Sequence, residues 1–534
     1  MAAPGYGENG SVIGPQNLPT TSAASGVWSL GEIAEANRDG IWPKPFDGFI
    51  AQFESGFPSQ TVLYTGGVDL DSNDDLFISF RSYGNPSSAS EYSGGFAKIN
   101  TTTNTLTDTR LFRVGAGTDY TGLSNLTVDS AGSDDIILSG DCDVSGTFGV
   151  YTVKLNSSYV EQWFGINSSD QIWRRTSGQA SYVNYPSSHR MSPNGTYLYA
   201  SGYGWDGSGY DPMMVPVSPS TGYRLGTTNI TDDSNPSGMG LYFRCQALNN
   251  SNYAWMTFPY HSSYGGYHNH VLKVYNTGGG ASATGLRIDF GGGSYSGGTY
   301  MSEASNGDLY NTVANADRYP YMGVIQGGTG SGTAYFFRWN HASGWNTFDQ
   351  GYRFVVNAAD SPVTPTTISN LYGIAFSADD STCYATMGDN GGTPSQQYLV
   401  SFDPDTSSTT VNWQRKILVY KTGDSMPGSQ QSCSFTNMKL DSTGENIYFA
   451  GHVSSSGNAQ NKLLVFKLPT DGSGEGTYTV GDFTVVYGTS NMTGTQGDLV
   501  GSTTGNTMFD FTPNENGTGT RTGSAETGTL TVGS

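Results

Sequence analysis

The pair His268-Asn-His270 is the most metal-like feature of this sequence. On a β-strand, residues two apart point to the same face, so three copies of this pair around a symmetry axis could surround an octahedral ion. The chain contains only six His, however, and a pair at this spacing arises readily by chance. We therefore predict no metal site and no other cofactor.

Carboxylates are the second group that could do chemistry, because a pair projecting into the centre of a ring of β-sheets would suit glycoside hydrolysis. Adjacent acids such as Asp379 and Asp380 stand in stretches typical of turns, where an aspartate bonds to the nearby backbone. The sequence also lacks the GxSxG, HExxH and GxxxxGK[ST] motifs. We expect no catalytic residue and no enzymatic activity.

Aromatic residues set among Gly, Ser, Asn and Asp form the third group. Their rings can stack on sugar faces while short polar side chains meet hydroxyls, although the same rings could instead pack on neighbouring loops or an adjacent subunit. We place them on loops at one rim of the fold. The candidate ligand-binding residues are Tyr203, Trp205, Tyr210, Tyr260, Tyr264, Tyr267, Tyr319 and Tyr321.

A repeat along the chain supplies the elements that must position these loops. Each unit reads as a short strand, a polar turn, an apolar strand, a long loop, a second apolar strand, a turn and a last strand. The polar turns begin 56 to 72 residues apart, which suits a four-stranded blade. They lie at 71–74, 129–132, 192–195, 249–252, 305–308, 377–380 and 441–444.

Composition agrees with an all-β fold. The 74 Gly and 13% aromatic residues, against 13% charged residues, favour short strands joined by tight turns. We predict a β-propeller of about seven four-stranded blades, with six or eight blades, or an elongated array of β-sandwiches, as alternatives. The net charge of −21 repels phosphate backbones and anionic lipids, and no long apolar run occurs, so we expect neither nucleic-acid binding nor membrane insertion.

Two segments flank the predicted propeller at 46–487. Residues 1–45 form an arm with one short helix, capped by Ser29 and Glu32 and ended by Gly40. Residues 488–534 form a Gly/Thr-rich β extension that either pairs with another chain or stays flexible. The four Cys are far apart and are read as buried free thiols.

The arm carries the most specific pattern, from Val12 to Pro43. It combines Gly-Pro-x-Asn-x-Pro-Thr from Gly14, Ser-Gly-Val-Trp-Ser-Leu up to Leu30, and Trp-Pro at its end. This segment resembles the opening of tail-fibre and virion structural proteins of marine tailed phages, notably those of cyanobacteria. The resemblance implies an attachment arm joined to interchangeable β-rich bodies, and that family carries no catalytic residues. The implied virion-docking residues are Gly14, Pro15, Trp28, Leu30, Trp42 and Pro43.

Together these observations predict a phage virion structural protein, tail-fibre-like or adhesin-like. The arm would attach to other virion proteins, and the propeller would contact host-surface glycan through several weak contacts, as a homo-oligomer in the particle. The start of the sequence has no basic segment followed by an apolar core, so the expected location is the virion, assembled in the host cytoplasm. The alternatives are a scaffold such as a tail nozzle, connector or capsid decoration, and a polysaccharide depolymerase.

Overall fold

The computed structural model describes residues 48–53, 61–85, 88–112, 123, 125–130, 132–144, 147–166, 183–191, 198–205, 210–222, 228–229, 244–247, 253–262, 266–276, 281–288, 321–326, 333–339, 348–355, 370–379, 381–388, 396–403, 411–423, 432–454, 462–490, 493–496, 508–511 and 530–531. Within these ranges the chain forms strands and turns, and no helix occurs that could span a membrane. The all-β prediction is confirmed. The predicted arm helix, Ser29 to Gly40, lies outside the described residues.

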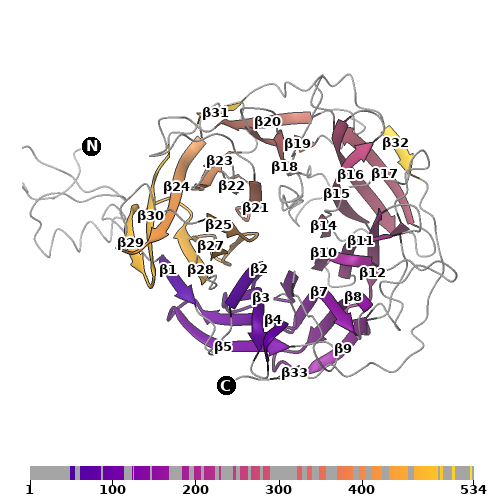
Figure 1. Ribbon diagram of the computed structural model, residues 1–534. Coiled ribbons are helices and arrows are strands. Elements are labelled where there is room, and N and C mark those ends of the chain that lie inside the picture. The colour runs from indigo at the N-terminus through magenta and orange to yellow at the C-terminus, as the bar shows by residue number, and fades with distance from the viewer. Residues whose placement is uncertain are drawn as a thin grey trace, which may run out of the picture.

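The described strands form seven antiparallel sheets arranged as a ring (Figure 1). Sheet 1 contains β2 (Thr61–Leu70), β3 (Leu76–Asn85), β4 (Ser88–Asn100) and β5 (Thr105–Phe112). Sheet 2 contains β6 (Asn125–Val128), β7 (Ile136–Val144), β8 (Thr147–Leu155) and β9 (Glu161–Ile166). Sheet 3 contains β10 (Val183–Met191), β11 (Leu198–Trp205), β12 (Tyr210–Val217) and β13 (Thr228–Asn229).

The remaining sheets follow in chain order. Sheet 4 contains β14 (Arg244–Ala247), β15 (Tyr253–Ser262), β16 (Gly266–Asn276) and β17 (Ala281–Ile288). Sheet 5 contains β18 (Tyr321–Gln326), β19 (Thr333–Trp339) and β20 (Phe348–Val355). Sheet 6 contains β21 (Asn370–Phe376), β22 (Cys383–Gly388), β23 (Gln397–Phe402) and β24 (Val411–Lys421). Sheet 7 contains β25 (Ser432–Phe435), β26 (Lys439–Leu440), β27 (Asn446–Ser454) and β28 (Lys462–Pro469).

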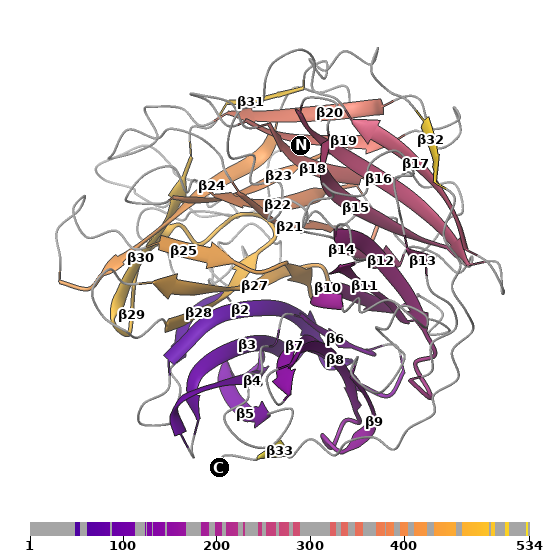
Figure 2. The ribbon, with the colours of Figure 1, turned by 45° about the vertical axis from the view of Figure 1, so that its right-hand side comes forward.

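Sheet 7 combines the first described strand with strands from late in the chain. Strand β1 (Phe49–Phe53), the first in the described part, is the outermost strand of this sheet and pairs with β28. Phe49 pairs with Lys467, and Phe53 pairs with Leu463. Because β1 precedes sheet 1 in the chain, this pairing joins the last sheet to the first and closes the ring (Figure 1). Figure 2 shows the same ring turned by 45°.

After β28 the chain adds strands to the outer edges of earlier sheets. Strands β29 (Gly476–Val480) and β30 (Phe483–Thr489) extend sheet 6 next to β24, and β31 (Thr493–Gln496) pairs with β20. Strand β32 (Met508–Phe511) pairs with β17, and β33 (Leu530–Thr531) pairs with β5. Four strands are the common unit of these sheets, as predicted, and the added strands bring sheet 6 to six. These C-terminal strands pair with the outer strands of the ring.

The predicted polar turns are confirmed where they are described. Three of the seven join the first and second strands of sheets 1, 2 and 6, and a fourth joins β26 to β27 in sheet 7, where β25 and β26 both pair with β27. In the first, Asp71 Oδ1 accepts from the amides of Asn73 and Asp75, both at 2.9 Å. Asp441 Oδ1 likewise accepts from the Glu445 amide at 2.9 Å. These bonds fix the reversal because the side chain replaces a missing backbone partner. The turns at 192–195, 249–252 and 305–308 lie outside the described residues.

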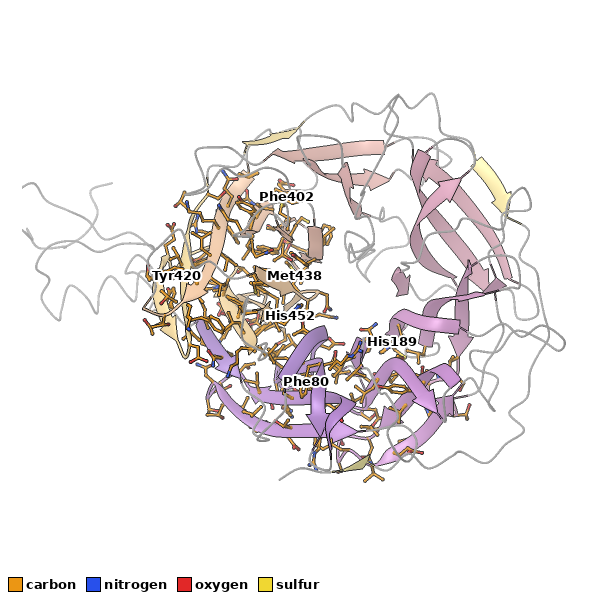
Figure 3. The ribbon with its side chains drawn as sticks, in the orientation of Figure 1. Phe80, His189, Phe402, Tyr420, Met438 and His452 are labelled. Atoms are coloured by element: carbon orange, nitrogen blue, oxygen red, sulfur yellow. The ribbon has the colours of Figure 1, made fainter. Side chains whose placement is uncertain are left out.

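Apolar side chains of the middle strands fill the spaces between neighbouring sheets. Between sheets 6 and 7, Phe449 stacks on Phe466 with ring centroids 4.8 Å apart, and Phe435 lies 4.9 Å from Phe449. Burying each such ring contributes about 2–3 kcal/mol. Figure 3 labels Met438, which is buried in the same core. Cys383 and Cys433 are buried free thiols, as predicted. The ring is thus held by cores between its sheets.

Polar side chains join the innermost strands across the sheet boundaries. Asn437 of sheet 7 accepts from the Val68 amide at 2.8 Å and donates to the Val68 carbonyl at 3.1 Å, so its amide substitutes for a strand neighbour. Asp69 accepts from the Val128 amide of sheet 2 at 3.0 Å and pairs with Lys439 of sheet 7 at 3.1 Å. Asp69 therefore connects three consecutive sheets near the ring axis.

Candidate binding surface

The two ends of the sheets differ in how their strands are connected. One end, which we call the turn side, holds the short connections 71–75, 101–104, 129–135, 156–160, 377–382 and 441–445. The opposite end, the hairpin side, holds the connections between second and third strands and the links between sheets, because antiparallel neighbours alternate in direction.

The prediction of long loops between second and third strands needs correction in the first four sheets. Strands β3 and β4 are joined by 86–87, and strands β7 and β8 by 145–146. The connections at 206–209 and 263–265 are similarly short. Here the strands themselves continue to the rim, and the longer connections run from one sheet to the next.

Five of the predicted aromatic ligand residues lie at hairpin ends on this side. Trp205 of β11 pairs with Tyr210 of β12, and Tyr203 pairs two positions further in, with Pro212. In sheet 4, Tyr260 and Tyr267 stand on the paired strands β15 and β16, opposite His268 and His261. Because β10 of sheet 3 contacts β14 of sheet 4, the structure brings these two aromatic hairpins into neighbouring sheets.

Tyr321 lies in sheet 5, outside these two hairpins. Tyr321 begins β18 and pairs with Arg338 of β19, so it is part of a strand and not of a connection between second and third strands. Tyr264 and Tyr319 lie outside the described residues, and so do the docking residues Gly14, Pro15, Trp28, Leu30, Trp42 and Pro43.

The candidate metal pair lies in β16, where His268 pairs with Tyr260 and His270 with Phe258 on β15. The two positions are on one face of the strand, as the spacing predicts. Over the ranges that the structure describes, no three His, Cys, Asp or Glu side chains gather in a group able to hold an ion.

Asp379, one of the two candidate carboxylates, is held as a turn residue. It accepts from the hydroxyls of Ser377 at 2.7 Å and Ser381 at 2.8 Å, and from the Ser381 amide at 3.1 Å. These hydrogen bonds, with the Ser377 bond the largest cause, lower the pKa of Asp379 to about 2. The carboxylate is exposed on the turn side and ionised, which suits a turn and not an acid catalyst. Asp380 lies outside the described residues.

The sequence analysis did not identify the lysines that form ion pairs with aspartates on the turn side. Lys98 of β4 pairs with Asp71 at 2.7 Å and Asp75 at 3.1 Å, and Lys154 of β8 pairs with Asp135 at 2.7 Å. In both sheets, a lysine stands one residue before the end of the second apolar run, and its acid stands directly before the first apolar run. That repeated pairing was the signal available in the sequence.

No family model matches the chain, and no curated protein matches it. Solved structures do. One is the polysaccharide lyase Uly1, at 10% identity and TM-score 0.41, covering 79% of this chain and 99% of that one. Another is a protein of unknown function from Dyadobacter fermentans, at 9% identity and TM-score 0.37, covering 79% and 99%. A third is the β-propeller domain of the Trilobed protease from Pyrococcus furiosus, at 6% identity and TM-score 0.38, covering 76% and 94%.

These similarities correct one expectation. The sequence motifs led us to exclude an enzyme, yet the matched structures include a lyase and a domain of a protease, so the exclusion is wrong. Missing short motifs exclude only the chemistries that use those motifs. At such low identity, the similarities assign no activity to this chain.

Proposed function

We propose that this chain is a structural component of a tailed-phage particle, tail-fibre-like or adhesin-like, that contacts host-surface glycan with the hairpin side of its ring. Its ring is taken as a propeller of seven blades, which the seven sheets and the β1–β28 pairing support. The resemblance of Val12 to Pro43 to the opening of phage virion proteins supports the virion assignment.

One observation carries the proposal most directly: the arm joins the ring at the end opposite the aromatic hairpins. Phe49, at the start of β1, pairs with Lys467, close to Pro469, where β28 ends and leads into the turn at Thr470. The chain therefore enters β1 from the turn side. Trp205, Tyr210 and Tyr267 stand at the hairpin side. A particle attached through the arm would then be separated from a glycan by the height of the ring.

The negative charge of the chain is compatible with a neutral ligand. The turn side carries acids such as Asp74, Asp134 and Glu445, and the whole chain has a net charge of −21. An anionic ring suits neutral hydroxylated ligands better than nucleic acid, because stacking on rings and hydrogen bonds to hydroxyls need no positive field.

The test measures binding of the purified full chain to host cells and to their isolated surface polysaccharide. Trp205→Ala combined with Tyr210→Ala is expected to weaken binding at least tenfold, since each stacked ring contributes about 1 kcal/mol or more. Val160→Ala, an exposed apolar residue on the turn side, is the control and should bind normally. Release of oligosaccharide is followed in the same samples, so that degradation is distinguished from binding. Absence of binding in every sample would favour the scaffold alternative.

A further inference from the structure

Sheet 6 contains two buried polar side chains that make no hydrogen bond to the protein. Gln397, the first residue of β23, is 1% exposed, and neither its Oε1 nor its Nε2 has a partner. Thr386 of β22 is 0% exposed, and its Oγ1 also has no partner. Leaving a buried amide or hydroxyl unpaired costs about 1–3 kcal/mol, and native proteins contain few such groups.

The two groups face the same space. Gln397 pairs with Gly388, and Thr386 pairs with Leu399, so Thr386 and Gln397 are diagonal neighbours on one face of the sheet. Diagonal neighbours have Cα atoms about 7–8 Å apart. One bridging oxygen, with hydrogen bonds of about 2.8 Å on each side, can connect polar side chains across that separation.

Gly388 and Tyr372 shape this space. A Cβ at Gly388 would lie 2.1 Å from Gln397 Oε1 and 2.7 Å from Cε2 of Tyr372, so only glycine leaves room for the amide. Tyr372 in turn packs edge-on against Phe435 of sheet 7, at 5.7 Å between ring centroids. The Gln397 amide therefore lies at the hairpin-side end of the apolar core between sheets 6 and 7.

Gln397 and Thr386 lie near the hairpin side of the ring. Strand β22 ends at Gly388 and β23 begins at Gln397, and the connection between them, 389–396, belongs to that side. We propose that Gln397 and Thr386 bind a hydroxyl group, either that of an ordered water or that of a neutral saccharide. A hydroxyl accepts from an amide N–H and donates to an oxygen, which matches the three unpaired atoms. The saccharide source rests on the proposed function, whereas the water source does not.

Thermal unfolding of Gln397→Met, Thr386→Val and the double variant tests this site. If a hydroxyl is bound, Gln397→Met removes the amide that forms hydrogen bonds to that hydroxyl, and Tm should fall by about 1–3 °C. The double variant should lose less than the sum of the single losses, because both side chains act on one group. Gln162→Met, an exposed glutamine on β9, is the matched control and should leave Tm unchanged.

The sign of the shift decides the outcome. If Gln397→Met leaves Tm equal or higher, or if the two single shifts simply add, the site is a dry packing defect and the inference is overturned. Galactose and glycerol added to each protein identify the source. If galactose raises the Tm of the wild type but not that of Gln397→Met, the hydroxyl comes from a saccharide. If the difference in Tm between the two proteins is the same with and without either additive, the hydroxyl comes from water. Binding to host surfaces is measured separately, so failure of the proposed function leaves this result interpretable.

Discussion

Ser442 and Asp74 lie in equivalent turns of neighbouring sheets and are joined by two hydrogen bonds. The Ser442 amide donates to Asp74 Oδ1 at 2.9 Å, and its hydroxyl donates to Oδ2 at 2.6 Å. Ser72 makes the same two bonds to Asp134 of the next sheet, at 2.8 and 2.6 Å. Both aspartates adopt positive φ, 59° and 55°, which presents each carboxylate to the preceding turn. The turn side is therefore linked from sheet 7 through sheet 1 to sheet 2.

Removing this link should destabilise the ring modestly. We expect Ser442→Ala to reduce the free energy of unfolding by about 0.5–1.5 kcal/mol, because the bond is charge-assisted but exposed. Chemical unfolding of Ser442→Ala, Asp74→Asn and the double variant measures the effect and the coupling between the two residues. Ser158→Ala, in an exposed turn of sheet 2, is the control. Equal losses in the control would show that the paired contact contributes nothing specific.

Gly373 is predicted to be intolerant of any side chain. A Cβ there would lie 2.8 Å from the Met438 amide nitrogen and 3.1 Å from Cα of Asn437, so the backbones of sheets 6 and 7 would have to separate. Gly373→Ala should cost about 2 kcal/mol or more in unfolding free energy. Gly488→Ala is the matched control, since its Cβ meets nothing within 4 Å. Similar stability of both variants would contradict the close approach of the two inner strands.

His452 predicts a specific loss of stability in mild acid. Burial lowers its pKa from 6.5 to about 4, because the charged form loses its hydration. Between these values the unfolded chain binds a proton that the folded chain does not, so unfolding becomes easier as pH falls from about 6.5 to about 4. The contribution is on the order of 3 kcal/mol at the lower end.

The His452→Gln variant isolates that contribution from those of the carboxylates. We expect the difference in unfolding free energy between pH 7 and pH 4.5 to be smaller in the variant than in the wild type. An identical pH dependence in the two proteins would show that His452 titrates normally in the fold.

The closing strand β1 should depend on the C-terminal hairpin. The Asp482 amide donates to Gln52 Oε1 at 2.8 Å, Gln52 Nε2 donates to Asp482 Oδ2 at 3.4 Å, and Lys462 lies 3.6 Å from the same carboxylate. Asp482→Ala should therefore increase amide hydrogen exchange in residues 49–53 relative to β27. Thr479→Ala, exposed on the same hairpin, should not. Unchanged exchange in Asp482→Ala would mean that pairing with β28 alone holds the strand.

Most of the ring could be predicted from the repeat, because its signals are short patterns of neighbouring residues. Turn aspartates such as Asp71 and Asp441 and the apolar runs behind them are short sequence patterns, and the structure has strands and turns where they occur. The rim was misjudged because Tyr203 and Trp205, among glycines, look like loop residues, while register with β12 keeps them in a strand. Cross-strand pairing outweighs propensity at such positions.

Contacts between distant segments could not be predicted from spacing. Asn437 and Val68 are 369 residues apart, and their bond follows only from closure of the ring. The same holds for β31, β32 and β33, whose partner strands lie far earlier in the chain. The site around Gln397 was missed because its polar atoms matter only once the sheets bury them.

Electron microscopy of intact phage particles, with this chain traced in the map, tests the central claim most directly. We expect the turn side and the start of β1 at Phe49 to face the particle, and Trp205, Tyr210 and Tyr267 at the hairpin side to face solvent. A map in which the hairpin side is covered by other virion proteins would contradict attachment to the host and leave a scaffold.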